Sequence, residues 1–289
     1  MTQDILKGTG VALVTPFNDD LSIDFDGLKK VLDHVSEGKV EYLVVLGSTG
    51  EAATIDHAEK LNILEFVIKN NKKDLPIVMG LGGNNTLAME KEVRGLDDYP
   101  IAAILTSSPH YNKPSQQGIV AHYQRFADAS KFPVILYNVP SRTGSNMSAD
   151  TTIELSKHSN IIGIKEASGD LSQCAKIIKN SSKDFLMISG DDALTFPMIS
   201  LGANGVISVI ANLLPAEFSE MVRVALSGET ENARILNEKL ITFYELLGLE
   251  GNPVSLKVGM SAFGIINDSV RLPLVSGSKA LFDQFKKRA

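Results

Sequence analysis

The chain has 289 residues, of which 44% are hydrophobic and 21% are charged, and its formal net charge at pH 7 is −6. This length is sufficient for one large α/β domain or two small ones, and the composition is ordinary for a globular protein. Because nucleic acids and anionic membranes attract a basic surface, the acidic balance argues against both kinds of partner.

Short apolar runs recur along the chain, each bounded by turn residues. None alternates cleanly between polar and apolar residues, which is typical of strands buried on both faces of a parallel sheet. The eight runs cover residues 11–14, 42–46, 77–79, 101–105, 134–137, 161–164, 185–188 and 206–210. Segments with apolar residues at helical spacing lie between them, at 25–35, 58–68, 119–127, 171–178 and 215–225.

Eight strand runs that alternate with helices predict an α/β fold, the (β/α)8 TIM barrel. A doubly wound open sheet is the rival, but no Gly-x-Gly-x-x-Gly opens a helix after the first strand. The rhythm changes after residue 227, where helical patterns at 233–247, 254–260 and 279–287 predict a C-terminal helical extension. We therefore expect a catalytic barrel domain at 1–226 and a C-terminal helical domain at 227–289.

The run at 161–164 leads directly into Lys165, and a small polar loop follows. Burial among β-forming residues disfavours a charged ammonium group. A lysine that is partly neutral near pH 7 can attack a carbonyl carbon and form a Schiff base. The alternative is a lysine at the end of a strand whose amine extends to solvent.

Other polar residues follow the strand runs, at the barrel end where such folds carry their chemistry. Ser48 and Thr49 lie between two glycines, in a turn whose N–H and hydroxyl groups could hold a carboxylate or a phosphate. Tyr137 ends the strand before that of Lys165, so the two side chains could meet at the same height and the hydroxyl could move protons. Arg142 could bind a substrate carboxylate. The alternative for Ser48 and Thr49 is an ordinary turn that caps a helix. For Tyr137 it is a half-buried aromatic side chain, and for Arg142 it is a solvated surface charge.

Metal-binding patterns are weak in this sequence. Asp191 and Asp192 are adjacent carboxylates, but helix capping is the better interpretation of them, and the five histidines have no metal-ligand spacing. Cys174 is the single cysteine, so no intramolecular disulfide can form. No apolar run approaches the ~20 residues of a membrane span, and residues 1–7 are too polar for a signal peptide, so we expect a cytoplasmic protein without a metal.

Six motifs, in order and spacing, resemble those of the dihydrodipicolinate synthase family, within the pyruvate-dependent class I aldolases that include N-acetylneuraminate lyase. The resemblance covers essentially the whole chain. The motifs are Gly47-Ser48-Thr49-Gly50-Glu51, His110-Tyr111-Asn112-Lys113-Pro114, Tyr137-Asn138-Val139-Pro140-Ser141-Arg142-Thr143, Gly163-Ile164-Lys165-Glu166-Ala167, Ser189-Gly190-Asp191-Asp192 and Gly205-Val206-Ile207-Ser208.

The resemblance implies that Lys165 forms a Schiff base with pyruvate. It also implies a proton relay of Tyr137, the Ser48 hydroxyl and Tyr111, with Tyr111 reaching across from a neighbouring subunit. Ser48 and Thr49 would hold the pyruvate carboxylate.

The second substrate implied by the resemblance is L-aspartate 4-semialdehyde, whose carboxylate Arg142 would receive. Gly190 and Ile207 would line the pyruvate pocket through their backbones. The family further implies a lyase of lysine and diaminopimelate biosynthesis, a cytoplasmic homotetramer built as a dimer of dimers, and no cofactor or catalytic metal.

The sequence departs from the family pattern at several positions. Ser48 stands where most members have threonine, which keeps the hydroxyl, and His110 often is a tyrosine. At the lysine-binding subunit interface His57 is kept, but Lys60 replaces a histidine and Ala88 occupies the position of a glutamate. Because Lys60 repels an ammonium group and Ala88 cannot pair with one, we expect L-lysine to inhibit weakly or not at all.

Two other functions are alternatives to this activity. The first is a related lyase or aldolase acting on N-acetylneuraminate or a 2-keto-3-deoxy sugar acid. Arg142 argues against it, since a polyhydroxylated aldehyde needs hydroxyl and amide partners. The second is a non-catalytic pyruvate-binding protein on a former enzyme scaffold. The presence of Lys165, Tyr137 and Ser48 argues against that alternative.

Overall fold

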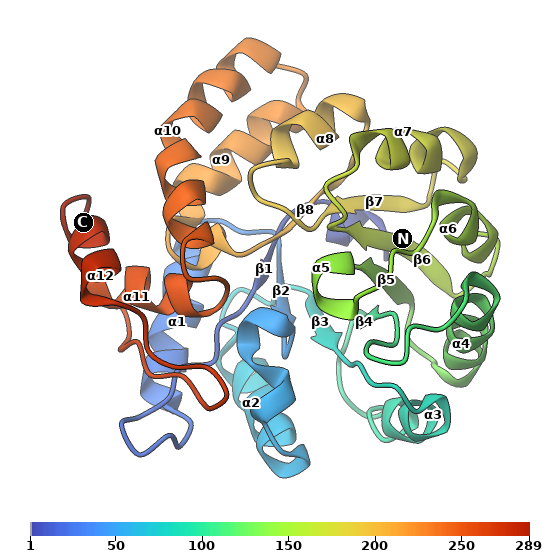
Figure 1. Cartoon of the computed structure of the whole chain (residues 1–289), viewed down its shortest axis with the longest axis horizontal. Coiled ribbons are helices and arrows are strands. Elements are labelled where there is room, and N and C mark those ends of the chain that lie inside the picture. Colours follow the sequence, from blue (N-terminus) through green and yellow to red (C-terminus); the bar gives the residue numbers. More distant parts are fainter. Residues whose placement is uncertain (1) are drawn as a thin grey trace.

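The structure is a computed structural model, and it describes residues 2–289. Eight parallel strands close into a barrel in the order in which they occur along the chain, and Figure 1 shows helices around it. This confirms the predicted (β/α)8 barrel. The strands are β1 (Gly8–Ala12), β2 (Tyr42–Val45), β3 (Ile77–Gly80), β4 (Ala103–Ser107), β5 (Val134–Asn138), β6 (Ile161–Glu166), β7 (Leu186–Ser189) and β8 (Gly205–Ser208).

Helices connect the strands and extend the chain beyond β8. The helices are α1 (Phe25–Glu37), α2 (His57–Asn70), α3 (Thr86–Arg94), α4 (Gln116–Ala129), α5 (Pro140–Thr143), α6 (Ala149–Leu155), α7 (Leu171–Asn180), α8 (Thr195–Leu201), α9 (Pro215–Leu226), α10 (Thr230–Gly248), α11 (Val254–Ala262) and α12 (Lys279–Lys286). Figure 1 shows α10, α11 and α12 together on one side of the barrel, where α10 packs against α9 and α11 against α12. The predicted C-terminal helices are thus present. None of the helices described in residues 2–289 has the length and apolar character to cross a membrane.

Side chains fill the barrel interior, so the barrel has a packed core. Tyr42 of β2 is fully buried there. The opposite position on β1 must be a glycine, because a Cβ atom at Gly10 would lie 2.1 Å from the Tyr42 ring. Glycine at this point makes room for a large aromatic side chain on the neighbouring strand.

Most strand boundaries differ from the prediction by one to three residues, and β1 and β8 show why. β1 begins at Gly8 rather than Val11, because the backbone of Gly8 pairs with Gly205 of β8 and needs no apolar side chain to do so. β8 ends at Ser208, since the following apolar residues form the short 3-10 helix η4 (Ile210–Asn212). Apolar character alone predicted burial correctly but not the ends of the ladder.

At the start of two helices, α2 and α9, the residues that favour helix initiation lie where the sequence indicated. The Asp56 side chain accepts the backbone N–H of Glu59 at 2.8 Å, while the Glu59 carboxylate accepts the N–H of Asp56 at 3.1 Å. This is the capping box expected at the start of α2. Pro215 occupies the first turn of α9, where its missing N–H removes no helical hydrogen bond.

Candidate active site

Lys165 and Tyr137 lie side by side at the carboxyl end of the barrel. They are register partners on β6 and β5, as the strand-end positions predicted. Lys165 is 5% exposed, and its Nζ lies 4.6 Å from the centroid of the Tyr137 ring. The amine is therefore buried directly against an aromatic face whose hydroxyl could move protons.

The wall beside Lys165 is made of small and apolar residues. A Cβ atom at Gly190 would lie 3.1 Å from Cε of Lys165 and 2.7 Å from Cβ of Ala167, so glycine here leaves the lysine its space. Ile207 of β8 is 1% exposed and belongs to the same interior cluster as Tyr137 and Ile188. Gly190 therefore lies against the predicted lysine, while Ile207 lies in the interior cluster that contains Tyr137.

The turn after β2 presents the two predicted hydroxyl groups. It contains the 3-10 helix η2 (Ser48–Gly50), in which Ser48 is exposed and Thr49 is buried. The Thr49 hydroxyl accepts a hydrogen bond of 2.9 Å from the side-chain amide of Asn252. The Ser48 side chain is therefore exposed, whereas the Thr49 hydroxyl is buried and fixed by Asn252.

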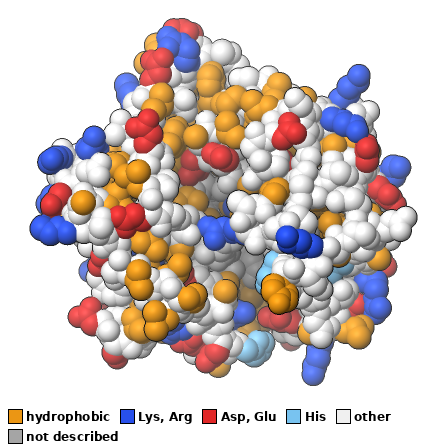
Figure 2. Space-filling model, in the orientation of Figure 1, with side chains coloured by type: hydrophobic (Ala, Val, Ile, Leu, Met, Phe, Trp, Pro, Cys, Tyr) orange, Lys and Arg blue, Asp and Glu red, His pale blue; other side chains and the backbone are white. Residues whose placement is uncertain are grey.

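Asn252 was not recognised from the sequence. Besides binding Thr49, its carbonyl oxygen accepts a hydrogen bond of 3.0 Å from the guanidinium of Arg142. Arg142 is exposed on α5, which lies across the mouth of the barrel (Figure 1). Figure 2 shows the surface hollowed near the centre of this face. A loop from the C-terminal part of the chain thus joins the β2 and β5 sides of the mouth.

Tyr111 lies apart from the other predicted relay residues within this chain. It is 89% exposed, on a loop where its φ of 65° is left-handed. In the described residues, 2 to 289, no hydrogen bond joins the hydroxyl groups of Tyr111, Ser48 and Tyr137. Within the described part of one chain, Tyr111 is therefore not hydrogen-bonded to Ser48 or Tyr137, and a relay that includes it needs a Tyr111 from a second chain.

Glu166, next to Lys165 on β6, was also missed as a possible site residue. Its carboxylate is 1% exposed and accepts hydrogen bonds from the Asn138 amide at 3.0 Å, the Ser168 backbone N–H at 2.7 Å and the Gln173 amide at 3.0 Å. These contacts tie β5, β6 and α7 together immediately behind the lysine. An acidic residue after an apolar strand was the only signal in the sequence.

The two carboxylates after β7 bind backbone N–H groups but do not cap α8, the role predicted for them, because the N-cap of α8 is Leu194, which makes no side-chain cap hydrogen bond. Asp191 accepts the N–H groups of Ala193 and Leu194 at 3.0 and 3.3 Å. Asp192 accepts those of Val209 and Ile210, and burial raises the pKa of Asp192 to about 6. Among residues 2–289, no group of three or more histidine, cysteine or acidic side chains could hold a metal ion.

Comparison with known proteins identifies the family. The model of the dihydrodipicolinate synthetase family matches residues 5–289. The chain belongs to this family. A 4-hydroxy-tetrahydrodipicolinate synthase of Flavobacterium psychrophilum is 47% identical over 285 residues, which cover 97% of each chain.

Solved structures agree with the family assignment. Dihydrodipicolinate synthase of Thermotoga maritima superimposes with a TM-score of 0.95 at 31% identity, over 98% of this chain and 97% of that one. The chloride-inhibited enzyme of Acinetobacter baumannii, solved in complex with pyruvate, gives a TM-score of 0.95 at 34% identity over the same shares. Together the relatives indicate 4-hydroxy-tetrahydrodipicolinate synthase activity, that of a class I aldolase-type lyase in lysine and diaminopimelate biosynthesis, and not the two alternatives.

Proposed function

We propose that the chain joins pyruvate to L-aspartate 4-semialdehyde through a Schiff base on Lys165, in the cytoplasm. The observation that carries this proposal is the buried amine of Lys165 against the Tyr137 ring. The amine adds to the pyruvate carbonyl, water leaves, and loss of a methyl proton gives the enamine that attacks the aldehyde carbon. Tyr137 is placed to carry protons in these steps.

The turn after β2 is the proposed cradle for the pyruvate carboxylate. Ser48 and Thr49 supply hydroxyl and backbone N–H groups in a short 3-10 turn, an arrangement suited to an anion. Ser48 also completes the proposed proton relay with Tyr137. The walls of the pocket would be the backbones of Gly190 and Ile207, with no metal or cofactor in the proposed mechanism.

Arg142 is the proposed receptor for the carboxylate of L-aspartate 4-semialdehyde. Its guanidinium is exposed on α5 with a single hydrogen bond to Asn252, which leaves donors for a bidentate contact. We expect Arg142→Ala to lower kcat/KM for the aldehyde at least tenfold, since loss of a charged hydrogen bond removes about 1.5–3 kcal/mol. Initial rates at varied aldehyde and varied pyruvate measure this. Collapse of pyruvate affinity alone would contradict the assignment.

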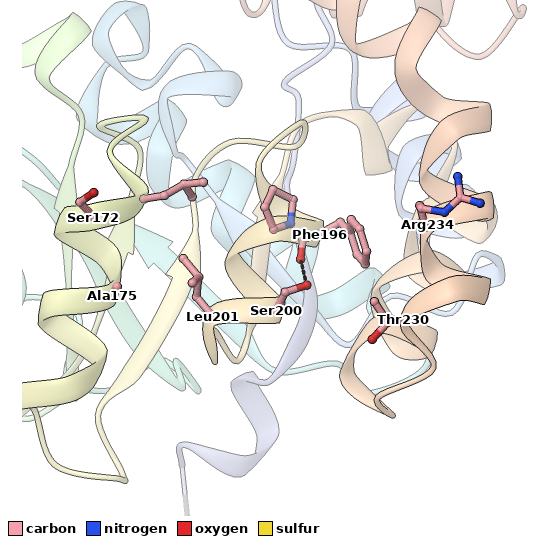
Figure 3. A pocket seen from close by; sticks show the side chains of 9 residues that line it. Ser172, Ala175, Phe196, Ser200, Leu201, Thr230 and Arg234 are labelled. Carbon is pink, nitrogen blue, oxygen red and sulfur yellow. Dashed lines mark hydrogen bonds between the residues drawn. The ribbon is translucent and has the colours of Figure 1, made fainter.

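We propose that the chain works as a homotetramer made of two dimers. The exposure of Tyr111 supports this, because a second copy is the natural source of the missing relay contact. A groove of about 580 Å³ also lies between α7, α8 and α10 (Figure 3), and its lining is mainly apolar. Leu201, which lies in this groove, is 41% exposed, as expected for a side chain that a second copy would cover.

Leu201→Asp is expected to weaken that contact, because it places a charge in an apolar interface. Sedimentation should then give a mass of two 31.2 kDa chains rather than four. Arg223→Ala, on α9 and outside the groove, is the control and should leave the assembly unchanged. If Leu201→Asp still formed an unchanged tetramer, the groove would not be part of the interface between subunits.

L-Lysine is expected to inhibit weakly or not at all, for reasons that the structure supports. α3 begins at Thr86, so Ala88 lies in its first turn and offers no carboxylate. Glu90, the nearest acidic substitute, is held by Arg125 at 2.8 Å. Lys60 would add a repulsive charge. A titration of initial rates checks this: half-inhibition below about 1 mM, or ~4 kcal/mol of binding, would mean that the pocket is intact.

A further inference from the structure

The residue that closes the proposed carboxylate cradle has an unusual backbone. Glu51 follows η2 with φ 54° and ψ 33°, in the left-handed region that side-chain-bearing residues seldom adopt. Its carbonyl oxygen accepts the N–H and the hydroxyl of Thr54 at 2.9 and 3.1 Å. The conformation of Ser48 and Thr49 therefore depends on what holds Glu51 in place.

A buried ion pair holds the Glu51 side chain. Nζ of Lys257, on α11, lies 2.6 Å from one carboxylate oxygen, and the backbone N–H of Arg271 donates to the other at 3.1 Å. Glu51 is 4% exposed and Lys257 is 0% exposed. Burial lowers the pKa of Lys257, and the neighbouring Glu51 carboxylate opposes this effect.

The same aromatic ring contacts both C-terminal cations. Nζ of Lys257 lies 4.2 Å and the Arg271 guanidinium 4.5 Å from the centroid of Phe17. Lys257 also donates to the carbonyl oxygen of Ser269 at 2.8 Å. The lysine amine is therefore fixed from several directions, and its position relative to Glu51 is well defined.

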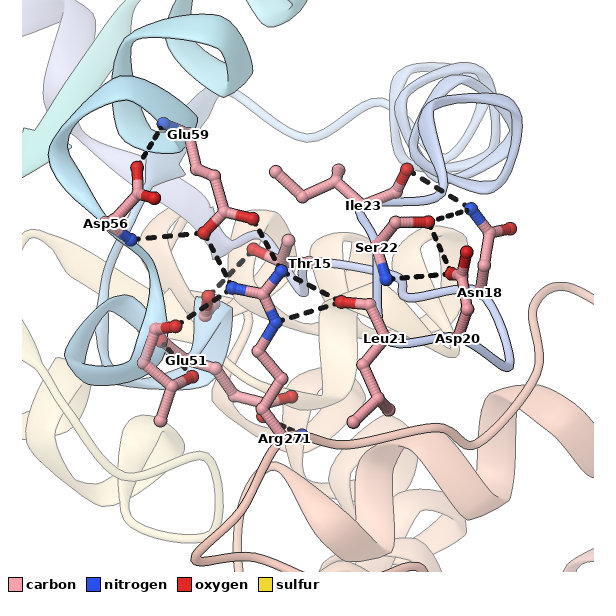
Figure 4. A network of polar contacts seen from close by, with 12 residues as sticks. Thr15, Asn18, Asp20, Leu21, Ser22, Ile23, Glu51, Asp56, Glu59 and Arg271 are labelled. Atoms are coloured by element: carbon pink, nitrogen blue, oxygen red, sulfur yellow. Dashed lines mark hydrogen bonds and ion pairs between the residues drawn. The ribbon is translucent and has the colours of Figure 1, made fainter.

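Arg271 extends this network to the start of α2. Its guanidinium forms two hydrogen bonds of 2.6 Å with the Glu59 carboxylate and binds the carbonyl oxygens of Leu21 and Thr54. Figure 4 shows Arg271 between Glu59 and Leu21, close to Glu51. Because Glu59 belongs to the capping box of α2, the helix that follows the cradle is anchored to the same segment.

Each of the last three residues of the cradle is thus held by a separate contact. Asn252 binds the Thr49 hydroxyl, the Thr15 hydroxyl donates to the carbonyl oxygen of Gly50 at 2.8 Å, and Lys257 binds Glu51. Two of the three contacts come from the chain beyond α10. A buried ion pair is not a stabilising device by itself, since desolvation opposes the attraction, but it fixes one geometry.

We propose that Glu51 and Lys257 are positioning residues for pyruvate binding: their ion pair holds the Ser48–Thr49 turn, so that α11 sets the affinity for the pyruvate carboxylate. This rests on the proposed role of Ser48 and Thr49. Lys165 stands on β6 and is not part of the network, so its chemistry should survive when the pair is neutralised.

The test is the double variant Glu51→Gln/Lys257→Met, which removes both charges together and leaves neither one unpaired. Its half-saturating pyruvate concentration in borohydride trapping, and its KM for pyruvate, should rise roughly tenfold to a hundredfold. Its KM for the aldehyde should change far less, and saturating pyruvate should still label Lys165. The control is Glu41→Gln/Arg223→Met, a pair at 3.1 Å at the opposite end of the barrel, which should keep the wild-type KM.

Two further variants separate the possible failures. Thr49→Val tests the cradle itself: unchanged pyruvate affinity would mean that the proposed function misplaces the carboxylate. If Thr49→Val weakens pyruvate but the double variant does not, the cradle stands and the positioning role is overturned. If the double variant does not fold, Glu51→Gln alone decides, because it keeps the size of the side chain and an oxygen acceptor but loses the negative charge that Lys257 binds. A several-fold rise in pyruvate KM supports the proposal, and a wild-type KM overturns it.

Discussion

Lys165→Met is expected to lower kcat/KM for the condensation at least about a thousandfold, a loss of ~4 kcal/mol in transition-state stabilisation. Methionine fills a similar volume beside the Tyr137 ring and Gly190 but has no amine to add to a carbonyl. Initial rates with pyruvate and L-aspartate 4-semialdehyde measure the effect. Thermal unfolding should show a fold at least as stable as wild type, since a buried amine is replaced by an apolar group.

Lys176→Met is the control for this change. Lys176 is an exposed residue on α7, paired with Asp150 at 2.7 Å, and surface pairs contribute little. It should keep wild-type rates. If Lys165→Met retained more than about a tenth of the wild-type rate, a drop of less than ~1.4 kcal/mol, covalent catalysis by Lys165 would be wrong.

Tyr137→Phe is expected to lower kcat by a factor of about 10²–10⁴, the usual contribution of a positioned proton-transfer group. Tyr137 is 8% exposed and packs in the barrel interior, and phenylalanine keeps this packing while losing the hydroxyl. The KM for pyruvate should change less, because Ser48 and Thr49 are the proposed carboxylate contacts. Steady-state kinetics, with the rate of borohydride trapping, separate the two effects.

Tyr123→Phe is a matched control for the loss of a buried tyrosine hydroxyl. Tyr123 of α4 donates to the carbonyl oxygen of Thr106 at 2.9 Å. Loss of this hydrogen bond in Tyr123→Phe should lower the free energy of unfolding by about 1 kcal/mol and leave kcat unchanged. Equal kcat losses in the two variants would show that the Tyr137 hydroxyl has no specific role in proton transfer.

The sequence predicted the features that depend on local pattern. Continuous apolar runs marked all eight strands, since strands buried on both faces need little alternation. Strand-end positions were enough to place Tyr137 beside Lys165, because parallel neighbours end at the same edge. The capping box of Asp56 and Glu59 likewise needed only its own spacing.

The sequence did not predict contacts between residues far apart in the chain. Asn252 meets Thr49 across 203 positions, and it lies between the helical patterns predicted at 233–247 and 254–260, where no local pattern indicated a role. Lys257 lies in a helix that is apolar on nearly all sides, and a single lysine there was a signal that it needs a buried partner. Nothing local could indicate that Glu51, in a turn after β2, supplies it.

The most direct test of the account is to trap the intermediate in the unmodified protein. Pyruvate with borohydride should add one reduced pyruvate per chain, and peptide mass spectrometry should place it on Lys165. Omission of pyruvate should give no adduct, and exposed lysines should remain unlabelled. An adduct on another lysine, or none at saturating pyruvate, would contradict the Schiff-base mechanism.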